Sequence, residues 1–133
     1  MKTIFADSVY FFALVNARDT FHPRAAEFAA RSENPFVTTA WIITEVADGL
    51  CARATRETVI RLLDILQSSA DVEIVQPSAE LFQQGLERYR QRLDKNWSLT
   101  DCISFLVMEQ RGITEALTAD HHFQQAGFST LLA

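Results

Sequence analysis

Glycine, proline and cysteine are scarce in this sequence of 133 residues, which contains four, three and two of them respectively. No predicted strand is followed by a glycine-rich phosphate loop, so the sequence disfavours a nucleotide-binding Rossmann enzyme. The two cysteines, Cys51 and Cys102, lie far apart in apolar surroundings, without paired spacing or nearby ligand partners. We expect both to be small buried hydrophobic residues, which argues against a disulfide framework or a cysteine metal site.

Long apolar runs are also missing. No stretch reaches the roughly 18 uninterrupted apolar residues that are needed to cross a bilayer. The start of the chain lacks the basic segment and apolar run of a secretory signal. We therefore expect a soluble cytoplasmic protein that does not contact membranes. Because 133 residues suit one compact core, we assign residues 1–133 to a single domain.

Basic residues are outnumbered, since 12 Lys and Arg face 17 Asp and Glu and give a net charge of −5. This balance argues weakly against non-specific binding of nucleic acid, and any such contact would have to depend on a local basic patch. No lysine follows Lys95. A phosphotransfer or phosphatase domain also places an Asp after its first strand, but it would normally need a lysine near its later acids.

The hydrophobic pattern predicts short strands that alternate with helices. The expected strands are residues 3–6, 36–38, 72–75, 116–118 and 128–131. The expected helices are residues 8–15, 22–31, 40 to about 53, one from 55, one from 77, one from 98 to about 111, and 120–125. The helix from 77 carries Phe82, Leu86, Tyr89 and Leu93 along one apolar stripe. This alternation indicates an α/β fold with a mostly parallel five-stranded sheet flanked by helices.

Three acidic residues occupy comparable places in this pattern. Asp7 and Asp120 each follow a predicted strand and open a helix, and Asp101 lies in the first turn of an apolar, central helix. In open parallel sheets, strand carboxyl ends and helix amino ends face one crevice, so these carboxylates can converge. Each is also explained singly as a helix cap, because Asp is a good N-cap residue and the segment Ser98–Asp101 matches a capping box.

Glu45 is different because it lies inside a predicted helix, where no cap is needed. Trp41, Ile42 and Val46 surround it on the helix, so we expect it to belong to or border the buried face. An unpaired charge there is costly. No base stands three or four residues away, and a partner distant in the sequence remains an alternative. A shared metal ion accounts for Glu45 and the three other acids together.

The chemistry of such a metal follows from its ligands. Two carboxylates about 4 Å apart repel by about 4 kcal/mol at an effective dielectric of 20, so a converging cluster needs a cation or protons. Oxygen ligands without a cysteine or histidine cluster suit Mg²⁺ or Mn²⁺ better than zinc. A site of this kind binds phosphate oxygens and activates a water for attack on a phosphodiester.

Four motifs carry a resemblance to a known family. The segments Phe5–Ser8, Thr44–Val46, Ser98–Cys102 and Leu117–Phe123 resemble, in order and spacing, the acidic motifs of PIN-domain proteins. The VapC-type toxin ribonucleases of bacterial toxin–antitoxin pairs are the most similar members. The resemblance covers essentially the whole chain. It implies a PIN-like parallel sheet, dependence on Mg²⁺ or Mn²⁺, endonucleolytic cleavage of RNA, frequent homodimers and often a cognate antitoxin that blocks the acidic site.

The resemblance also assigns residues. The catalytic and metal-binding positions match Asp7, Glu45, Asp101 and Asp120, and the hydroxyl residues that often stand beside them match Ser8 and Thr118. The alternative function is a PIN-like RNA-processing or regulatory binding module without a toxin role or turnover.

Contacts to RNA are predicted around the approach to Asp101. We expect Trp97 to be exposed in a loop, where it can stack on a base. Arg88, Arg92 and Lys95 line the same approach and can neutralise phosphates, although a plain solvated face is the alternative. A second basic group, Arg53, Arg56 and Arg61, lies at another helix junction.

His121 and His122 suggest a general acid, because imidazole titrates near neutral pH. The metal mechanism does not require them, and adjacent residues on a helix point in different directions. We therefore do not expect a direct catalytic role for either histidine.

Overall fold

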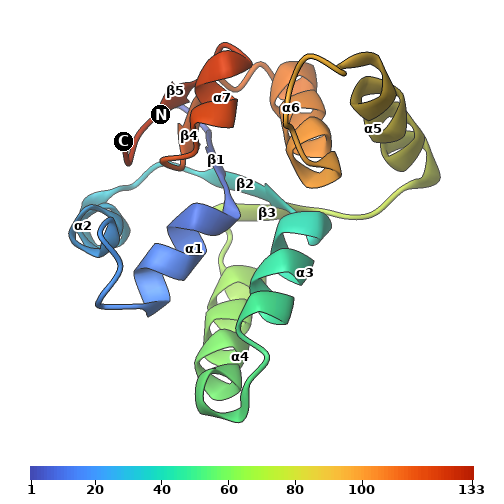
Figure 1. Ribbon diagram of the computed structural model, residues 1–133. Coiled ribbons are helices and arrows are strands. Elements are labelled where there is room, and N and C mark those ends of the chain that lie inside the picture. The colour runs from blue at the N-terminus through green and yellow to red at the C-terminus, as the bar shows by residue number, and fades with distance from the viewer.

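The computed structural model describes residues 1–133 as five strands and seven helices (Figure 1). The strands are β1 (Ile4–Ala6), β2 (Phe36–Thr39), β3 (Val72–Val75), β4 (Glu115–Leu117) and β5 (Ser129–Thr130). The helices are α1 (Ser8–Val15), α2 (His22–Arg31), α3 (Ala40–Gly49), α4 (Arg53–Ser68), α5 (Ala79–Gln91), α6 (Leu99–Arg111) and α7 (His121–Gln125). Each predicted strand and helix is therefore present.

The five strands are parallel and form one sheet in the order β3-β2-β1-β4-β5, which confirms the predicted α/β class. The chain moves outward from β1 to β2 and β3, and then returns to the other side of β1 for β4 and β5. Ligands of such sheets bind outside the strand carboxyl ends, at the place where the strand order reverses. Asp7 follows β1 and Asp120 follows β4, so both acids lie at this place.

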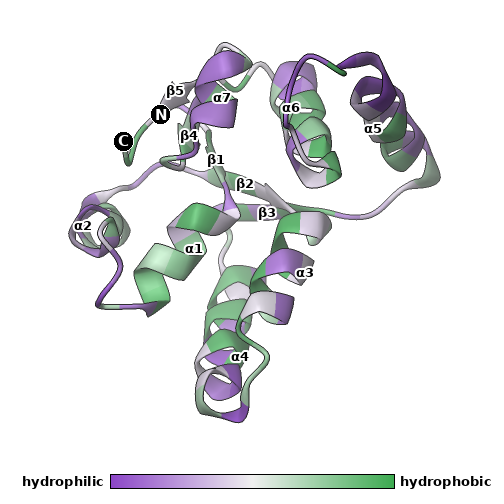
Figure 2. Cartoon of the chain, in the orientation of Figure 1, coloured by the Kyte–Doolittle hydropathy of each residue, from purple (hydrophilic) through white to green (hydrophobic).

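Helices cover both faces of the sheet (Figure 1). Helices α5, α6 and α7 lie on one face, and α1, α3 and α4 lie on the other. Figure 2 shows that α1 is hydrophobic over nearly its whole length, whereas α7 is mostly hydrophilic. None of the helices combines the length and the apolar character that crossing a membrane requires.

Helix α6 is buried on nearly all sides, as its apolar sequence predicts. Its Phe105 ring packs edge-on against Phe123 of α7, with centroids 4.9 Å apart, and against Trp97, at 5.0 Å. Phe123 also contacts Phe5 of β1. Because burial of one such side chain contributes roughly 1.5–3 kcal/mol, these rings hold the first turns of α6 and α7 against the end of β1.

The break between α3 and α4 differs from the prediction, because α3 ends at Gly49 rather than near Arg53, and α4 begins at Arg53. Side chains of α4 satisfy the carbonyl groups at the break. Arg56 donates to the Cys51 carbonyl at 3.0 and 2.9 Å, and Thr55 Oγ1 donates to the Leu50 carbonyl at 2.8 Å. Cys51 stands in this loop and is exposed, so its predicted burial was wrong.

Helix α5 turns its predicted apolar stripe outward. Phe82 and Tyr89 are exposed and Leu86 is half-buried. Leu93, predicted on the same helix, is 92% exposed and lies beyond the end of α5 at Gln91. The buried face instead contains Leu81 and Gly85. A Cβ atom at Gly85 would lie 2.5 Å from Cγ1 of Ile103 in α6, so glycine allows the close approach of the two helices. This contact orients α5 and leaves the stripe at the surface.

Candidate metal centre

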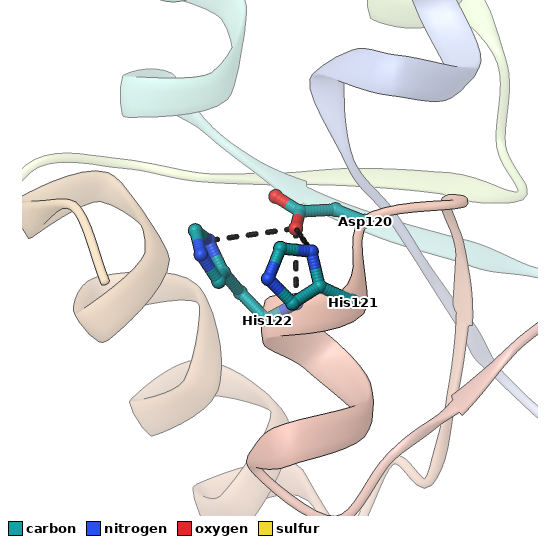
Figure 3. Close-up of side chains that lie close together, drawn as sticks. All are labelled: Asp120, His121 and His122. Atoms are coloured by element: carbon teal, nitrogen blue, oxygen red, sulfur yellow. Dashed lines mark hydrogen bonds and ion pairs between the residues drawn. The ribbon is translucent and has the colours of Figure 1, made fainter. Parts of the chain in front are cut away.

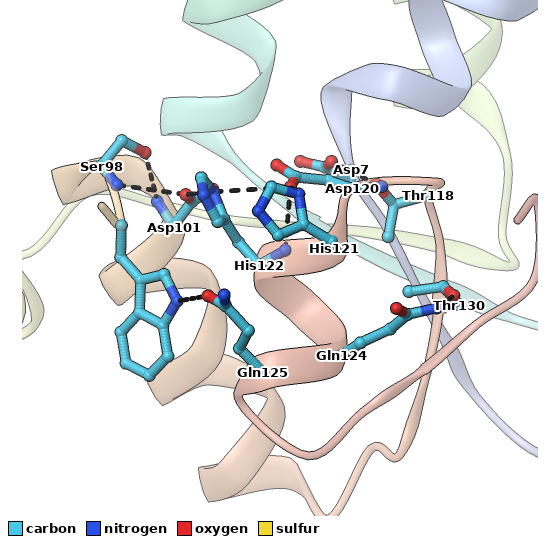
Figure 4. Close-up of polar contacts among 11 residues, drawn as sticks. Asp7, Ser98, Asp101, Thr118, Asp120, His121, His122, Gln124, Gln125 and Thr130 are labelled. Atoms are coloured by element: carbon cyan, nitrogen blue, oxygen red, sulfur yellow. Dashed lines mark hydrogen bonds and ion pairs between the residues drawn. The ribbon is translucent and has the colours of Figure 1, made fainter. Parts of the chain in front are cut away.

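Three of the four predicted acids converge at the carboxyl ends of β1 and β4. Asp7 is 4% exposed, Asp101 is buried in the first turn of α6, and Asp120 is half-buried at the start of α7. In Figure 4 their side chains point into one region between α1, α6 and α7. The charges of Asp101 and Asp120 act on each other, and the charge of Asp101 acts on Asp7.

Asp7 is held by a long-range contact and not by capping. Its side chain makes no capping hydrogen bond to α1. Instead, Thr118 Oγ1 donates to Asp7 Oδ2 at 2.8 Å, and the backbone N–H of Asp120 donates to Thr118 Oγ1 at 3.1 Å. The predicted place of Thr118 beside the acids is thus observed, since it joins two of them. The capping explanation of Asp7 does not hold.

Burial raises the pKa of Asp7 from 3.8 to about 7. Hydrogen bonds from Thr118 and from the backbone of Ser8 oppose this change in pKa, whereas the charges of Asp101 and Glu45 add to it. Burial also raises the pKa of Asp101, against the hydrogen bond from Ser98, and the charge of Asp120 adds to the increase. The cluster therefore favours a bound proton or cation in the folded protein.

The other two acids of the cluster do cap helices. Asp101 Oδ2 accepts from the Ser98 N–H at 3.1 Å, and Ser98 Oγ accepts from the Asp101 N–H at 3.0 Å, which completes the predicted capping box. Asp120 Oδ1 accepts from the N–H of His122 at 2.9 Å. Each carboxylate uses one oxygen for these bonds. Neither Asp101 Oδ1 nor Asp120 Oδ2 accepts a hydrogen bond, so each has an oxygen available for a cation.

Glu45 is exposed, which contradicts its predicted place on or beside the buried face. Helix α3 buries Ile42 and Val46, and this orientation turns Glu45 toward solvent. The expected cost of a buried charge does not arise. Glu45 nevertheless lies close enough to raise the pKa of Asp7 by its charge. Its nearness to Asp7, and not its burial, links it to the cluster.

No Lys or Arg forms an ion pair with any of these four acids. The ion pairs of Lys and Arg join other acids, on the outside of the molecule. Ser8 is buried at the start of α1, and its hydroxyl makes no hydrogen bond to another residue. The carboxylates thus lack a protein cation to balance them, apart from the histidines of α7.

Both histidines of α7 face Asp120 (Figure 3). His122 Nδ1 lies 3.1 Å from Asp101 Oδ2 and 3.4 Å from Asp120 Oδ1, and His121 Nδ1 lies 3.7 Å from the same Asp120 oxygen. The expectation that adjacent residues point apart was wrong here, because the ring centroids are only 4.4 Å apart. The two residues start a helix of five residues, where both side chains can fold back toward Asp120. Their position directly after Asp120 in the sequence was the signal that could have placed both histidines beside the acids.

The sequence predicted that Trp97 is exposed in a loop, and this prediction was wrong. It is 7% exposed, it packs against Phe105, and its Nε1 donates to Gln125 Oε1 of α7 at 3.0 Å. The ring fills space between α6 and α7, which removes its faces from a base. The Arg92 guanidinium lies 4.6 Å from the centre of the indole ring. Trp97 therefore supports the site from within.

The predicted basic residues near Asp101 are paired with acids. Arg92 binds Asp94 through two hydrogen bonds of 3.0 Å, and Lys95 lies 3.8 Å from the same carboxylate. Arg88 pairs with Glu109 of α6. The pairs lie at the surface, where exchange of one anion for another is inexpensive. The phosphate contacts expected of these three bases stay a prediction.

A parallel α/β fold with an acidic cluster at the reversal of strand order defines the class of protein. A family model of the PIN domain matches residues 4–129, and the chain belongs to this family. Among its relatives is the 23S rRNA-specific endonuclease VapC20 of Mycobacterium tuberculosis, found in two strains, which is 29% identical over 125 residues. The match covers 94% of this chain and 95% of VapC20.

A solved structure gives the same result. The crystal structure of Mycobacterium tuberculosis VapC20, described as a sarcin-ricin loop cleaving toxin, matches with a TM-score of 0.84 and 28% sequence identity. The match covers 94% of this chain and 95% of that structure. The resemblance to VapC-type PIN proteins and the predicted PIN-like fold are thereby confirmed.

Proposed function

We propose that this chain is an endoribonuclease of the VapC type that depends on Mg²⁺ or Mn²⁺ and acts as the toxin of a toxin–antitoxin pair. Asp7, Glu45, Asp101 and Asp120 are its proposed metal-binding and catalytic residues. The observation that carries the proposal is the state of Asp7, a buried carboxyl group whose pKa is raised to about 7 and which has no cationic partner. The similarity to a named endonuclease supports it.

The donor set fits a hard divalent cation. It offers carboxylate oxygens from four elements, and Asp101 and Asp120 each keep one oxygen free of hydrogen bonds. Such ligands suit Mg²⁺ and Mn²⁺. Burial raises the pKa values of Asp7 and Asp101, and the charges of neighbouring acids add to the increase. A divalent cation would offset both effects.

Residues of the chain prepare the site in distinct ways. Thr118 fixes the Asp7 carboxylate and the Asp120 backbone relative to each other. The capping box fixes Asp101 to the first turn of α6. Glu45 adds negative charge on the solvent side, and the backbone N–H of Ser8 donates to the Asp7 carboxyl group at the start of α1. The metal, when bound, supplies Lewis-acid polarisation of phosphate oxygens and an activated water.

RNA is proposed to approach along the segment that precedes Asp101. A surface cavity of about 680 Å³ lies there, and Arg92, Lys95, Trp97 and Ser98 are among its lining residues. Ser98 caps the helix that carries Asp101, so the cavity adjoins the first turn of α6. Arg88, Arg92 and Lys95 are the proposed phosphate contacts, with exchange of their present carboxylate partners for phosphate. Trp97 shapes this path and does not stack on a base.

The central experiment incubates purified protein with RNA in Mg²⁺ or Mn²⁺, with and without a chelator. Because VapC20 is named for 23S rRNA, ribosomal RNA is the first substrate, followed by unrelated RNA. The Asp7→Asn and Glu45→Gln variants are measured in parallel. We expect cleavage only with metal and with all four acids. Cleavage that persists in chelator or in both variants overturns the mechanism. RNA binding without cleavage favours the regulatory module.

The proposed partners are a cognate antitoxin and a second copy of the chain. The exposed Phe82 and Tyr89 of α5, with the exposed Leu93 just after it, support a protein partner, because exposed apolar patches mark interaction sites. Light scattering is expected to give twice the chain mass of 15.0 kDa. Expression of the chain alone is expected to arrest growth. Unimpaired growth, with no protein co-purified from the native host, contradicts the toxin role and leaves the nuclease proposal standing.

A further inference from the structure

We propose that Asp120, His121 and His122 form a binding site for a late first-row transition metal, with Zn²⁺ as its first ligand. This histidine site adjoins the acidic cluster and shares Asp120 with it. Zn²⁺ bound there inhibits cleavage that depends on Mg²⁺ or Mn²⁺. The binding of Zn²⁺ stands on the geometry alone, whereas the inhibition rests on the proposed function.

The positions of three donor atoms carry the proposal. Asp120 Oδ1 lies 3.4 Å from His122 Nδ1 and 3.7 Å from His121 Nδ1. One carboxylate oxygen of Asp120 and one nitrogen of each ring lie within 4.8 Å of one another. In tetrahedral zinc sites with ligand bonds near 2.0–2.1 Å, donor atoms lie about 3.3 Å apart. The three donors therefore need only small movements to share one ion, and His121 is free to move because its side chain is 71% exposed.

Hydrogen bonding alone does not explain this arrangement. His122 Nδ1 can direct one N–H at only one acceptor with good alignment, yet it lies near both Asp101 and Asp120. His121 Nδ1, at 3.7 Å from Asp120, is beyond hydrogen-bond distance. Figure 3 shows the two rings beside the same carboxylate. Two imidazoles thus gather around Asp120, although the hydrogen bond of the His122 ring goes to Asp101 Oδ2 and the His121 ring forms none with Asp120.

The donor types select the metal. Two imidazole nitrogens and one carboxylate suit Zn²⁺, and also Cu²⁺ and Ni²⁺, whereas ligand sets of oxygen alone suit Mg²⁺ and Mn²⁺. Asp101 Oδ2 is 3.1 Å from His122 Nδ1 and can supply a fourth ligand, in place of a water. The sequence suggested that the chain has no histidine cluster, but the fold brings His121 and His122 together. The chain thereby offers two neighbouring sites with different preferences.

Inhibition follows from the shared residue. An ion held by His121 and His122 occupies Asp120 and adds positive charge beside Asp101. Both effects weaken the binding of a second cation to the acidic cluster. Zn²⁺ also binds nitrogen-containing sites more strongly than Mn²⁺ does. Small amounts of Zn²⁺ are therefore expected to counteract an excess of Mn²⁺.

Binding is tested by titration of the full chain with Zn²⁺ against a chromophoric chelator, without RNA. His121→Ala is the key variant, because this exposed side chain can be removed without disturbing the core. We expect a loss of at least tenfold in Zn²⁺ affinity for His121→Ala and for His122→Ala. Zn²⁺ affinity in both variants equal to that of the wild type overturns the proposal.

Two control variants keep the test specific. His22→Gln changes the third histidine, which lies away from the cluster and whose Nδ1 is 2.8 Å from the Ala13 carbonyl oxygen. This variant is expected to leave Zn²⁺ affinity unchanged. Asp7→Asn removes one acid of the cluster but no ligand of the histidine site, so it should keep Zn²⁺ affinity within about threefold. A tenfold loss in Asp7→Asn places the ion in the acidic cluster and contradicts the proposal.

Inhibition is measured by adding Zn²⁺ to cleavage assays that contain Mn²⁺. We expect His121→Ala to require at least tenfold more Zn²⁺ than wild type for half inhibition. Equal sensitivity, or stimulation by Zn²⁺, overturns the inhibitory role. If the chain cleaves no RNA in Mn²⁺, the proposed nuclease function fails, while the affinities measured without RNA still decide the histidine site.

Discussion

Thr118 Oγ1 donates a hydrogen bond of 2.8 Å to Asp7 Oδ2, and so joins two residues that are 111 positions apart in the sequence. Thr118 is fully buried, and its hydroxyl oxygen also accepts the N–H of Asp120. One side chain thus sets the relative positions of the acids that follow β1 and β4. Because both of its contacts use the hydroxyl, they can be removed with little change in shape.

Thr118→Val tests this positioning role. The valine keeps the volume but leaves Asp7 and the Asp120 N–H without their partner, and loss of such outer contacts typically costs 10–100-fold in metal affinity or activity. We expect a loss of that size in Mn²⁺ affinity, measured by calorimetry, and in cleavage. Thr118→Ser retains the hydroxyl and should recover most of both. A Thr118→Ser variant as impaired as Thr118→Val would show that the methyl group, through packing, is what matters.

Asp7→Asn should stabilise the metal-free protein at alkaline pH. The pKa of Asp7 is about 7 in the folded chain and 3.8 in the reference state, so the unfolded chain loses its proton first as the pH rises. Stability therefore falls between about pH 4 and pH 7, and an asparagine avoids this loss. We expect Asp7→Asn to be more stable than wild type by roughly 2–4 kcal/mol at pH 8 and equal to it near pH 4.

Urea unfolding in chelator at both pH values provides the measurement. Asp64→Asn, which changes an exposed acid of α4, is the matched control and should differ little from wild type at either pH. An Asp7→Asn protein that is destabilised equally at pH 4 and pH 8 would contradict the raised pKa of Asp7.

Much of the fold follows from the hydrophobic pattern, because strands at β1 and β4 and the apolar helix α6 have strong local signals. The same pattern places Asp7, Asp101 and Asp120, since each follows a strand or opens a helix. The positions of these acids can be predicted without knowing how side chains pack, because the parallel sheet brings the strand ends together. The positions that depend on local pattern were therefore predicted correctly.

Orientation of a helix about its axis could not be predicted in the same way. The stripe of α5 is apolar, yet Gly85 packs on Ile103 and turns the stripe outward. Glu45 is exposed for a related reason, because α3 buries Ile42 and Val46 instead. Trp97 was expected at the surface but fills a space between two helices. Each of these outcomes depends on contacts between residues distant in the sequence.

Trp97 provides a prediction that separates a structural role from RNA contact. Trp97→Phe removes the hydrogen bond to Gln125 but keeps an aromatic ring against Phe105. We expect a loss of about 1 kcal/mol in stability and little change in RNA affinity. Trp97→Ala should cost about 3–5 kcal/mol through the cavity that it leaves. A tenfold loss of RNA affinity in Trp97→Phe, with stability unchanged, would instead assign the ring to base stacking.

Gly85→Ala tests the close packing of α5 on α6. The added Cβ would meet Ile103 Cγ1 at 2.5 Å, so the helices must separate or the isoleucine must change its conformation. We expect a loss of about 1–3 kcal/mol in the free energy of unfolding. Gln83→Ala, at an exposed position of α5, is the control. Gly112→Ala is less suitable, because the φ of 65° at Gly112 is itself unfavourable for alanine. A Gly85→Ala protein as stable as wild type would show that α5 can shift freely.

Metal binding should stabilise the protein in a manner that depends on pH. A ligand that binds only the folded state adds about 2.7 kcal/mol at 100 times its Kd. The Asp7 carboxyl must lose its proton to bind a cation, and burial holds its pKa at about 7. The increase in Tm caused by Mn²⁺ is thus expected to be large at pH 8 and small at pH 6. Asp7→Asn should show little increase at either pH, because the amide cannot supply the negative oxygen. An increase that is equal at both pH values in wild type would mean that Asp7 is not a ligand of the ion, even if Glu45, Asp101 and Asp120 are.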